Sequence, residues 1–150
     1  MTIRQLAVIA LTVAVAGCGT SAQQPTRRYV EPRTAADTAL PPFSGAVQVG
    51  DTLYLSGALG LDENRRVPET AAAEASNVLN SIRRTLERAG MTMDDLVVVQ
   101  VFCPDVSHYD AFNAVYRTYF TKEYPARAFI GSGPLLFGAR FEVQGIAVKR

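Results

Sequence analysis

Short apolar segments, separated by turn residues, divide most of the chain into strands and helices. Two such segments flank Gly50-Asp51, a pair favoured in two-residue hairpin loops, and predict a hairpin of Ala46–Val49 and Thr52–Ser56. The apolar run from Leu96 to Phe102, which ends at Cys103, predicts a strand covered on both faces. A helix on one side and another subunit on the other would provide that cover.

Two further segments have helical spacing. The first extends from about Glu69 to Ala89, with Gly90 as a natural residue beyond its C-terminus. The second begins near Ser107, where Ser107 and Asp110 stand at the spacing of a capping box, and Pro125 stops it. The apolar stripe of the first helix consists of Ala75, Leu79, Ile82, Leu86 and Ala89. The aromatic-rich face of the second consists of Tyr109, Phe112, Val115, Tyr116, Tyr119 and Phe120, interpreted as core rather than cofactor site.

The chain ends in two predicted strands, Pro125–Ile130 and Arg140–Val148, joined by a glycine-rich turn. Arg127 in the first and Glu142 in the second stand among apolar neighbours. If the two strands pair through this turn, the two charges lie near each other. The pair has two interpretations: a cross-strand ion pair contributing about 0.2–1 kcal/mol, or a site for a small anionic substrate and a water molecule.

The complete order is strand, strand, helix, strand, helix, strand, strand. This order predicts an α+β sandwich with the helices on one face of the sheet.

The N-terminus has the pattern of a targeting segment over residues 1–17. Arg4 precedes the apolar run Leu6–Ala16, and Val15–Cys18 resembles a bacterial lipobox, which predicts lipidation at Cys18. A simple secretory signal and an uncleaved anchor are the alternatives. Residues 18–42 are expected to form a flexible tether, and residues 43–150 the folded domain. The expected location is the bacterial cell envelope, lipid-anchored and facing the periplasm or exterior.

Charge and cysteine content narrow the possible functions. Lys and Arg total 15 and Asp and Glu total 14, so no basic excess favours a nucleic-acid partner. With Cys18 acylated, Cys103 has no cysteine to pair with, and its position at the end of a strand favours a small apolar core residue over a catalytic thiol. One His, His108, and one free Cys make a poor ligand set, so no metal site is predicted.

Several short motifs occur in an order typical of one family. Pro125-Ala126-Arg127 precedes a terminal strand of sequence Phe-Glu-Val-Gln-Gly-Ile-Ala-Val, Leu53–Gly57 forms a strand ending in Ser-Gly, and Asn113 lies in the second helix. In this combination the chain resembles the Rid (YjgF) family, the reactive-intermediate deaminases. The resemblance covers about Leu40 to Arg150.

The resemblance implies a chorismate-mutase-like fold and a homotrimer with clefts between subunits. It also implies hydrolysis of enamines and imines, such as 2-aminoacrylate and 2-imino acids, to 2-oxo acids and ammonia, without a cofactor. Arg127 would bind the substrate carboxylate, and Glu142 would orient or deprotonate the attacking water. Ser56, the Gly57 amide, Asn113 and Phe43 would contribute to substrate binding.

The chain departs from the family pattern in four ways. Phe43 stands where the deaminases usually carry Tyr, and Ala58 replaces a polar residue. The link from Asn113 to Arg127 is shorter than usual, and Gly133–Leu136 replaces the usual Leu-Pro. These changes make the expected pocket more apolar and leave the preferred substrate open.

The imines best linked to the family arise in the cytosol, whereas a lipoprotein would lie outside it. Two alternatives to an enzyme therefore stay open. One is a non-catalytic, lipid-anchored trimer that captures small carboxylates or acts as a chaperone, and the other is a structural envelope protein in which Arg127 and Glu142 form a simple ion pair.

Overall fold

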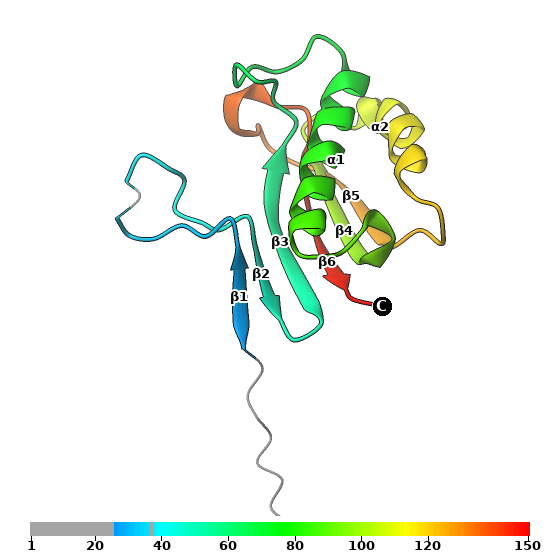
Figure 1. Ribbon diagram of the computed structural model, residues 1–150. Helices are drawn as coiled ribbons and strands as arrows, with labels where there is room; N and C mark the ends of the chain where they lie inside the picture. Colours follow the sequence, from blue (N-terminus) through cyan, green and yellow to red (C-terminus); the bar gives the residue numbers. More distant parts are fainter. Residues whose placement is uncertain (1–25, 37) are drawn as a thin grey trace, which may run out of the picture.

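The described residues form one mixed sheet with two helices packed on one of its faces (Figure 1). The structure is a computed structural model and describes residues 26–36 and 38–150. The expected α+β class, with both helices on the same face, is confirmed. None of the helices in these two ranges is long and apolar enough to cross a membrane.

The sheet of the described chain has six strands in the order β1-β2-β3-β6-β4-β5. Neighbouring strands are antiparallel except β4 and β5, which are parallel. The strands are β1 (Arg27–Val30), β2 (Ala46–Val49), β3 (Thr52–Leu59), β4 (Leu96–Cys103), β5 (Ala126–Gly131) and β6 (Glu142–Val148). The expected hairpin is β2 and β3, in which Val49 pairs with Thr52 and Gly50 has a φ of 59°.

The folded part begins earlier than expected. Residues 18–42 were expected to be a tether, but Arg27–Val30 form β1, whose Val30 is buried and pairs with Ala46 of β2. Because β1 is an edge strand, its polar residues are exposed. The segment therefore lacks the alternation of apolar and polar residues from which a strand could be predicted. The expected signal segment and the lipidation residue Cys18 lie outside the described residues.

Helix α1 (Ala71–Arg88) matches the first predicted helix. The Thr70 hydroxyl accepts a hydrogen bond from the Ala73 amide at 3.2 Å, and Gly90 beyond the C-terminus has a φ of 74°. All five residues of the predicted apolar stripe are buried against the sheet. The periodicity of this segment therefore predicted correctly both that it forms a helix and which face of the helix packs on the sheet.

Helix α2 (Tyr109–Tyr116) is shorter than predicted, because 3₁₀ turns precede and follow it. The capping box expected from Ser107 and Asp110 is wrong. The Asp105 carboxylate instead accepts a hydrogen bond from the Ser107 amide at 2.9 Å, because it lies two residues earlier, at the start of the first turn. The 3₁₀ turns of the described chain are η1 (Met93–Asp95), η2 (Val106–His108), η3 (Arg117–Tyr119) and η4 (Leu136–Gly138).

The core lies between the two helices and the sheet. Phe112 of α2 is fully buried, with ring centroids 4.9 Å from Phe141 and 5.7 Å from Phe129. Cys103 is also buried, and its thiol donates to the Asp105 carbonyl at 3.0 Å. Burial raises the pKa of the Cys103 thiol, which disfavours a reactive thiolate. The interpretation of Cys103 as a core residue is confirmed.

The expected pairing of the last two strands is wrong. β5 pairs with β4 alone, at the edge of the sheet, whereas β6 lies between β3 and β4. β6 pairs along its length with both neighbours, and its Val143 and Ala147 are buried on the side that faces the helices. The glycine-rich segment after β5 therefore connects two strands separated by β4.

A buried ion pair holds the start of β6. The Glu74 side chain of α1 is 0 % exposed, and its carboxylate is 2.8 Å from Nη1 of Arg140. The same carboxylate accepts hydrogen bonds from the amides of Arg140, at 2.6 Å, and Phe141, at 3.1 Å. Arg140 also donates to the carbonyls of Pro68 and Glu69. Glu74 thus fixes the backbone that leads directly into Glu142.

Replacing Glu74 by Ala should lower the free energy of unfolding by about 3 kcal/mol, because it leaves two backbone amides without their acceptor and the Arg140 guanidinium without its counter-ion. Glu87→Ala is the matched control on the same helix. It removes an exposed pair with Arg83 at 3.8 Å and should change stability by less than about 0.5 kcal/mol. Urea denaturation at one fixed protein concentration measures both, and equal losses would contradict the assigned role of Glu74.

Candidate active site

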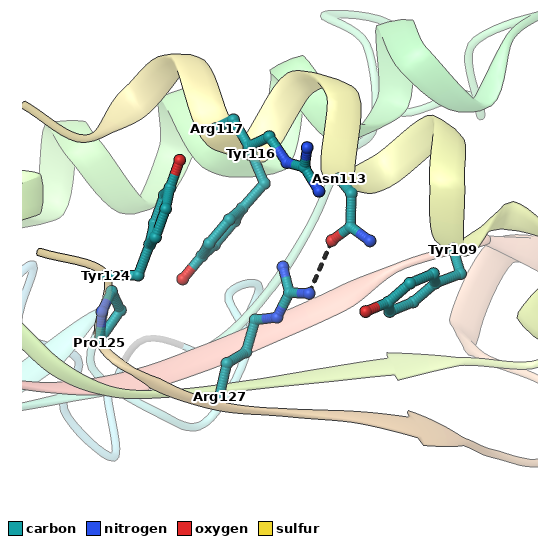
Figure 2. Close-up of a pocket in the computed structure, with 7 residues that line it drawn as sticks. All are labelled: Tyr109, Asn113, Tyr116, Arg117, Tyr124, Pro125 and Arg127. Carbon is teal, nitrogen blue, oxygen red and sulfur yellow. Dashed lines mark hydrogen bonds between the residues drawn. The ribbon is translucent and has the colours of Figure 1, made fainter.

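Arg127 lies on β5 and points toward α2 rather than into solvent. Its strand partner is the buried Val99, so its side chain is on the helix-covered face of the sheet. Nη2 of Arg127 donates to Oδ1 of Asn113 at 2.6 Å (Figure 2). The structure therefore brings together two of the residues named from sequence, and Asn113 fixes the direction of the guanidinium.

Three aromatic rings surround the Arg127 guanidinium. Its central carbon is 4.5 Å from the ring centroid of Tyr116 and 5.9 Å from those of Tyr109 and Phe112. Such contacts stabilise a cation by about 0.5–2 kcal/mol. The sequence prediction assigned these rings to the core only. The spacing of Tyr109, Asn113 and Tyr116 was an available signal, because residues four and three apart share one helix face.

Arg127 borders a cavity of about 290 Å³ between β5 and the end of α2. Its lining includes two guanidinium groups and no carboxylate, so the cavity suits an anion. Figure 2 shows the Arg117 side chain extending from the end of α2 toward Asn113 and Arg127. The lining residues are Tyr109, Asn113, Tyr116, Arg117, Tyr124, Pro125 and Arg127.

The Tyr116 hydroxyl is buried and has no hydrogen-bond partner among the described residues. The whole residue is 4 % exposed, and its ring stacks on that of Tyr124 with centroids 6.3 Å apart. Burial raises the pKa of Tyr116 to about 12, although the nearby Arg127 charge acts in the opposite direction. The phenol is therefore protonated at neutral pH.

Glu142 lies on the opposite face of the sheet. It alternates with the buried Val143, and its strand partners are Leu59 and Phe102. A methyl group added to Gly57 would overlap the Glu142 carboxylate, so the two residues are in close contact. Glu142 accepts no hydrogen bond from any described residue, so its oxygens are open to water or a ligand.

Phe43 and Ser56 lie near Gly57, where they line a separate cavity of about 180 Å³. Phe43 is 54 % exposed, and the Ser56 hydroxyl donates to the Ser44 carbonyl at 2.7 Å. Ser56 thus fixes the segment before β2, and its oxygen keeps free lone pairs. Of the residues named from sequence, Arg127 lies with Asn113, and Glu142 lies with Gly57. Ser56 and Phe43 line a cavity that residues of α1 also line and that Glu142 does not.

These two groups are far apart within one chain. Arg127 pairs with Val99 of β4, which in turn pairs with Gly145 of β6. Arg127 is therefore two strands away from β6, and Gly145 is three residues from Glu142 along that strand. The two α-carbons are therefore on the order of 14 Å apart, with their side chains on opposite faces. The expected proximity of Arg127 and Glu142 is wrong for a single chain. A simple ion pair between them within one chain is wrong for the same reason.

The face of the sheet opposite the helices is uncovered and partly apolar. Tyr54 is 50 % exposed and Val98 is 37 % exposed, and both are strand partners of Ile146. A shallow cavity of about 210 Å³ lies on this face, beside the hydrogen bond from Gln144 to Gln100 at 2.6 Å. Within residues 26–36 and 38–150, no three His, Cys, Asp or Glu side chains are placed to hold a metal ion.

Sequence comparisons match nearly all of the described chain. The family profile described as Endoribonuclease L-PSP matches residues 33–149. A mouse protein named 2-iminobutanoate/2-iminopropanoate deaminase is 36% identical over 124 residues, which are 81% of this chain and 92% of the relative. The bovine protein of the same name is 37% identical over 116 residues, 76% of this chain and 85% of the relative.

Solved structures have the same fold. RidA from the Antarctic bacterium Psychrobacter has a TM-score of 0.69 and is 30% identical, covering 84% of this chain and 98% of that one. The YjgF gene product of E. coli has a TM-score of 0.70 and 29% identity, covering 74% of this chain and 91% of that one. The arrangement of strands and helices is therefore shared over almost the whole folded part.

The buried Tyr116 hydroxyl should make the protein less stable at alkaline pH. The unfolded phenol loses its proton above a pH of about 10, whereas the folded one keeps it up to about 12, so high pH favours the unfolded chain. Between these values the free energy of unfolding should fall by up to about 1.4 kcal/mol per pH unit from this group. Urea denaturation at pH 9 and pH 11 measures the fall.

The fall should be smaller in Tyr116→Phe, which keeps the ring on Arg127. Tyr29→Phe, at an exposed tyrosine of β1, should behave like wild type. The assigned burial of the hydroxyl is contradicted if all three proteins lose the same stability.

Proposed function

The chain belongs to the family described as Endoribonuclease L-PSP, which includes the Rid (YjgF) proteins, and on this basis we propose that it is an imine deaminase. The proposed reaction converts small 2-imino acids, and 2-aminoacrylate through its imine tautomer, to 2-oxo acids and ammonia. The names of the mouse and bovine relatives support this class of substrate. The observation that carries the proposal is the Arg127 guanidinium, held by Asn113 at the border of a cavity without acidic residues.

Arg127 binds the substrate carboxylate in this proposal. Its single hydrogen bond to Asn113 uses Nη2, which leaves other N–H groups for a two-pronged contact that Lys cannot copy. The aromatic rings around it exclude water and strengthen the electrostatic contact. Asn113 is a positioning residue, because it acts on substrate through the guanidinium.

Glu142 positions the attacking water. The water oxygen bonds to the imine carbon while its proton passes through the carboxylate to the nitrogen. The carbinolamine hydroxyl then gives its proton to the amine nitrogen through the same carboxylate. The carbon–nitrogen bond breaks, the carbonyl forms, and ammonia leaves. The close contact with Gly57 supports this role, because a side chain at that position would displace the carboxylate. Ser56 and the Gly57 amide would fix the substrate nearby, with Phe43 forming an apolar wall.

The site forms between subunits in this proposal. Arg127 and Glu142 lie on opposite faces of one sheet, so a reaction centre that uses both requires a second copy of the chain. The uncovered face with Tyr54, Val98 and Ile146 offers the apolar surface on which such a copy would pack. In a homotrimer closed by this face, the proposed site combines Arg127 of one subunit with Glu142 of the next.

Charge argues against RNA as the substrate, although the description of the family profile names a ribonuclease. A protein that contacts several phosphates needs clustered Lys and Arg, whereas this chain has a formal net charge of +1. The cavity beside Arg127, which suits an anion, has a volume of about 290 Å³. This size fits a small free acid rather than a polynucleotide.

Lipidation at Cys18 is part of the same proposal and rests on the lipobox-like sequence. Since β1 begins at Arg27, the residues between lipid and domain could span at most about 30 Å. The domain would therefore sit close to the surface of the membrane, in the cell envelope, facing the periplasm or exterior. If Cys18 is acylated, the wild-type protein should be found with the membrane fraction of the cells, and Cys18→Ser should lose this association.

Replacing Arg127 by Ala should lower kcat/KM for 2-iminobutanoate about a hundredfold, because each charged hydrogen bond to the carboxylate contributes roughly 1.5–3 kcal/mol. The imine is generated in the cuvette by an amino-acid oxidase, and its loss is followed by absorbance. Arg84→Ala, on the exposed side of α1, is the control and should retain full activity. Wild-type rates in Arg127→Ala would overturn the role of this residue, and binding of 2-oxo acids without any turnover by wild type would favour a binding module.

A further inference from the structure

We propose that the cavity beside Arg127 selects imino acids with a second carboxylate, and that Arg117 binds this second acid group. The inference rests on the proposed function, because it names the substrate class for the same site. Neither the family profile nor the names of the relatives assign a role to Arg117.

The two arginines of the cavity have different surroundings. Arg127 is hydrogen-bonded to Asn113 and packed on the Tyr116 ring, which fixes its geometry. Arg117 is exposed at the start of η3, and no described residue accepts a hydrogen bond from its guanidinium or forms an ion pair with it. It nevertheless lines the same cavity and extends toward Asn113 and Arg127 (Figure 2). An arginine without a protein partner beside an anion site is available for a second anion.

The number of hydrogen-bond donors in the cavity also favours a second acid group. A single carboxylate that binds Arg127 through both oxygens leaves the Arg117 guanidinium without an acceptor. A ligand that supplies an acceptor for this second guanidinium gains a further charged hydrogen bond. A second carboxylate adds two oxygens and a second negative charge to a lining that has two cations and no acid.

The size of the cavity restricts the ligand to a small one. Its volume of about 290 Å³ is at the lower end of small-molecule sites, which are roughly 300–1,000 Å³. Four- and five-carbon dicarboxylic imino acids, such as 2-iminosuccinate and 2-iminoglutarate, are therefore the preferred substrates. The same two carboxylates are present in the stable 2-oxo acid products.

Calorimetry with two matched 2-oxo acids tests the inference on the full-length protein. 2-Oxoglutarate and 2-oxopentanoate have the same five-carbon chain, and only the first has a second carboxylate. Wild type should bind 2-oxoglutarate at least about tenfold more tightly than 2-oxopentanoate, because the second carboxylate adds one charged hydrogen bond. Arg117→Gln should remove this preference and leave the affinity for 2-oxopentanoate within about twofold.

Two further variants serve as controls. Arg84→Gln, on the exposed side of α1, removes the same charge away from the cavity and should leave both affinities unchanged. Arg117→Lys keeps the charge and should retain part of the preference. Because Arg117 has no partner among the described residues, its replacement is not expected to unfold the protein. Circular dichroism of each variant verifies that the fold is retained.

Three results would overturn the inference: no preference in wild type, an unchanged preference in Arg117→Gln, or an equal loss for both acids, which would mean that Arg117 shares the first carboxylate with Arg127. The binding assay needs no turnover, so it decides the role of Arg117 even if the deaminase proposal fails. Turnover of 2-iminobutanoate and 2-iminoglutarate at equal efficiency would leave the deaminase standing and reject the dicarboxylate selection.

Discussion

The placement of two charged side chains on opposite faces of one sheet is the constraint on which the proposed chemistry depends. Hydrogen bonding between strands fixes Arg127 toward the helices and Glu142 toward the uncovered face, and neither can cross without breaking the sheet. A reaction that needs both groups must therefore combine residues of two chains. In the proposed homotrimer, the exposed apolar residues of the uncovered face would form the contact between chains, which a monomer would leave in water.

Each of the two groups is held by contacts that have no direct part in the reaction. Asn113 and the aromatic rings of α2 orient Arg127, and the buried carboxylate of Glu74 fixes the backbone before Glu142. A charge as deeply buried as Glu74 is tolerated only with a full set of donors, which Arg140 and two amides provide. Helix α1 thus sets the position of the carboxylate side of the site, and α2 that of the guanidinium side.

The local features were predictable from sequence, and the long-range pairing was not. Gly50-Asp51, Gly90 and the stripe of α1 identified a hairpin, a helix end and a buried face, because each signal lies within a few neighbouring residues. The insertion of β6 between β3 and β4 depends on residues far apart in the chain. The alternation of buried and exposed residues along β6 would be the same whichever strands it paired with. Arg127 and Glu142 stood out as single charges among apolar strand residues, and the family resemblance added Asn113. Neither source contains information on which subunit supplies each residue. Tyr116 and Arg117 were missed because an aromatic at helical spacing and a solvent-facing arginine are ordinary in any helix.

Complementation between two inactive variants tests the composite site most directly. Arg127→Ala and Glu142→Gln are each purified, mixed in equal amounts, unfolded, refolded together and assayed with 2-iminobutanoate. If each site takes Arg127 from one subunit and Glu142 from its neighbour, random reassortment restores about a quarter of the wild-type activity. If both residues act within one chain, no mixture contains an intact site, and activity that stays at the level of the separate variants would contradict the account.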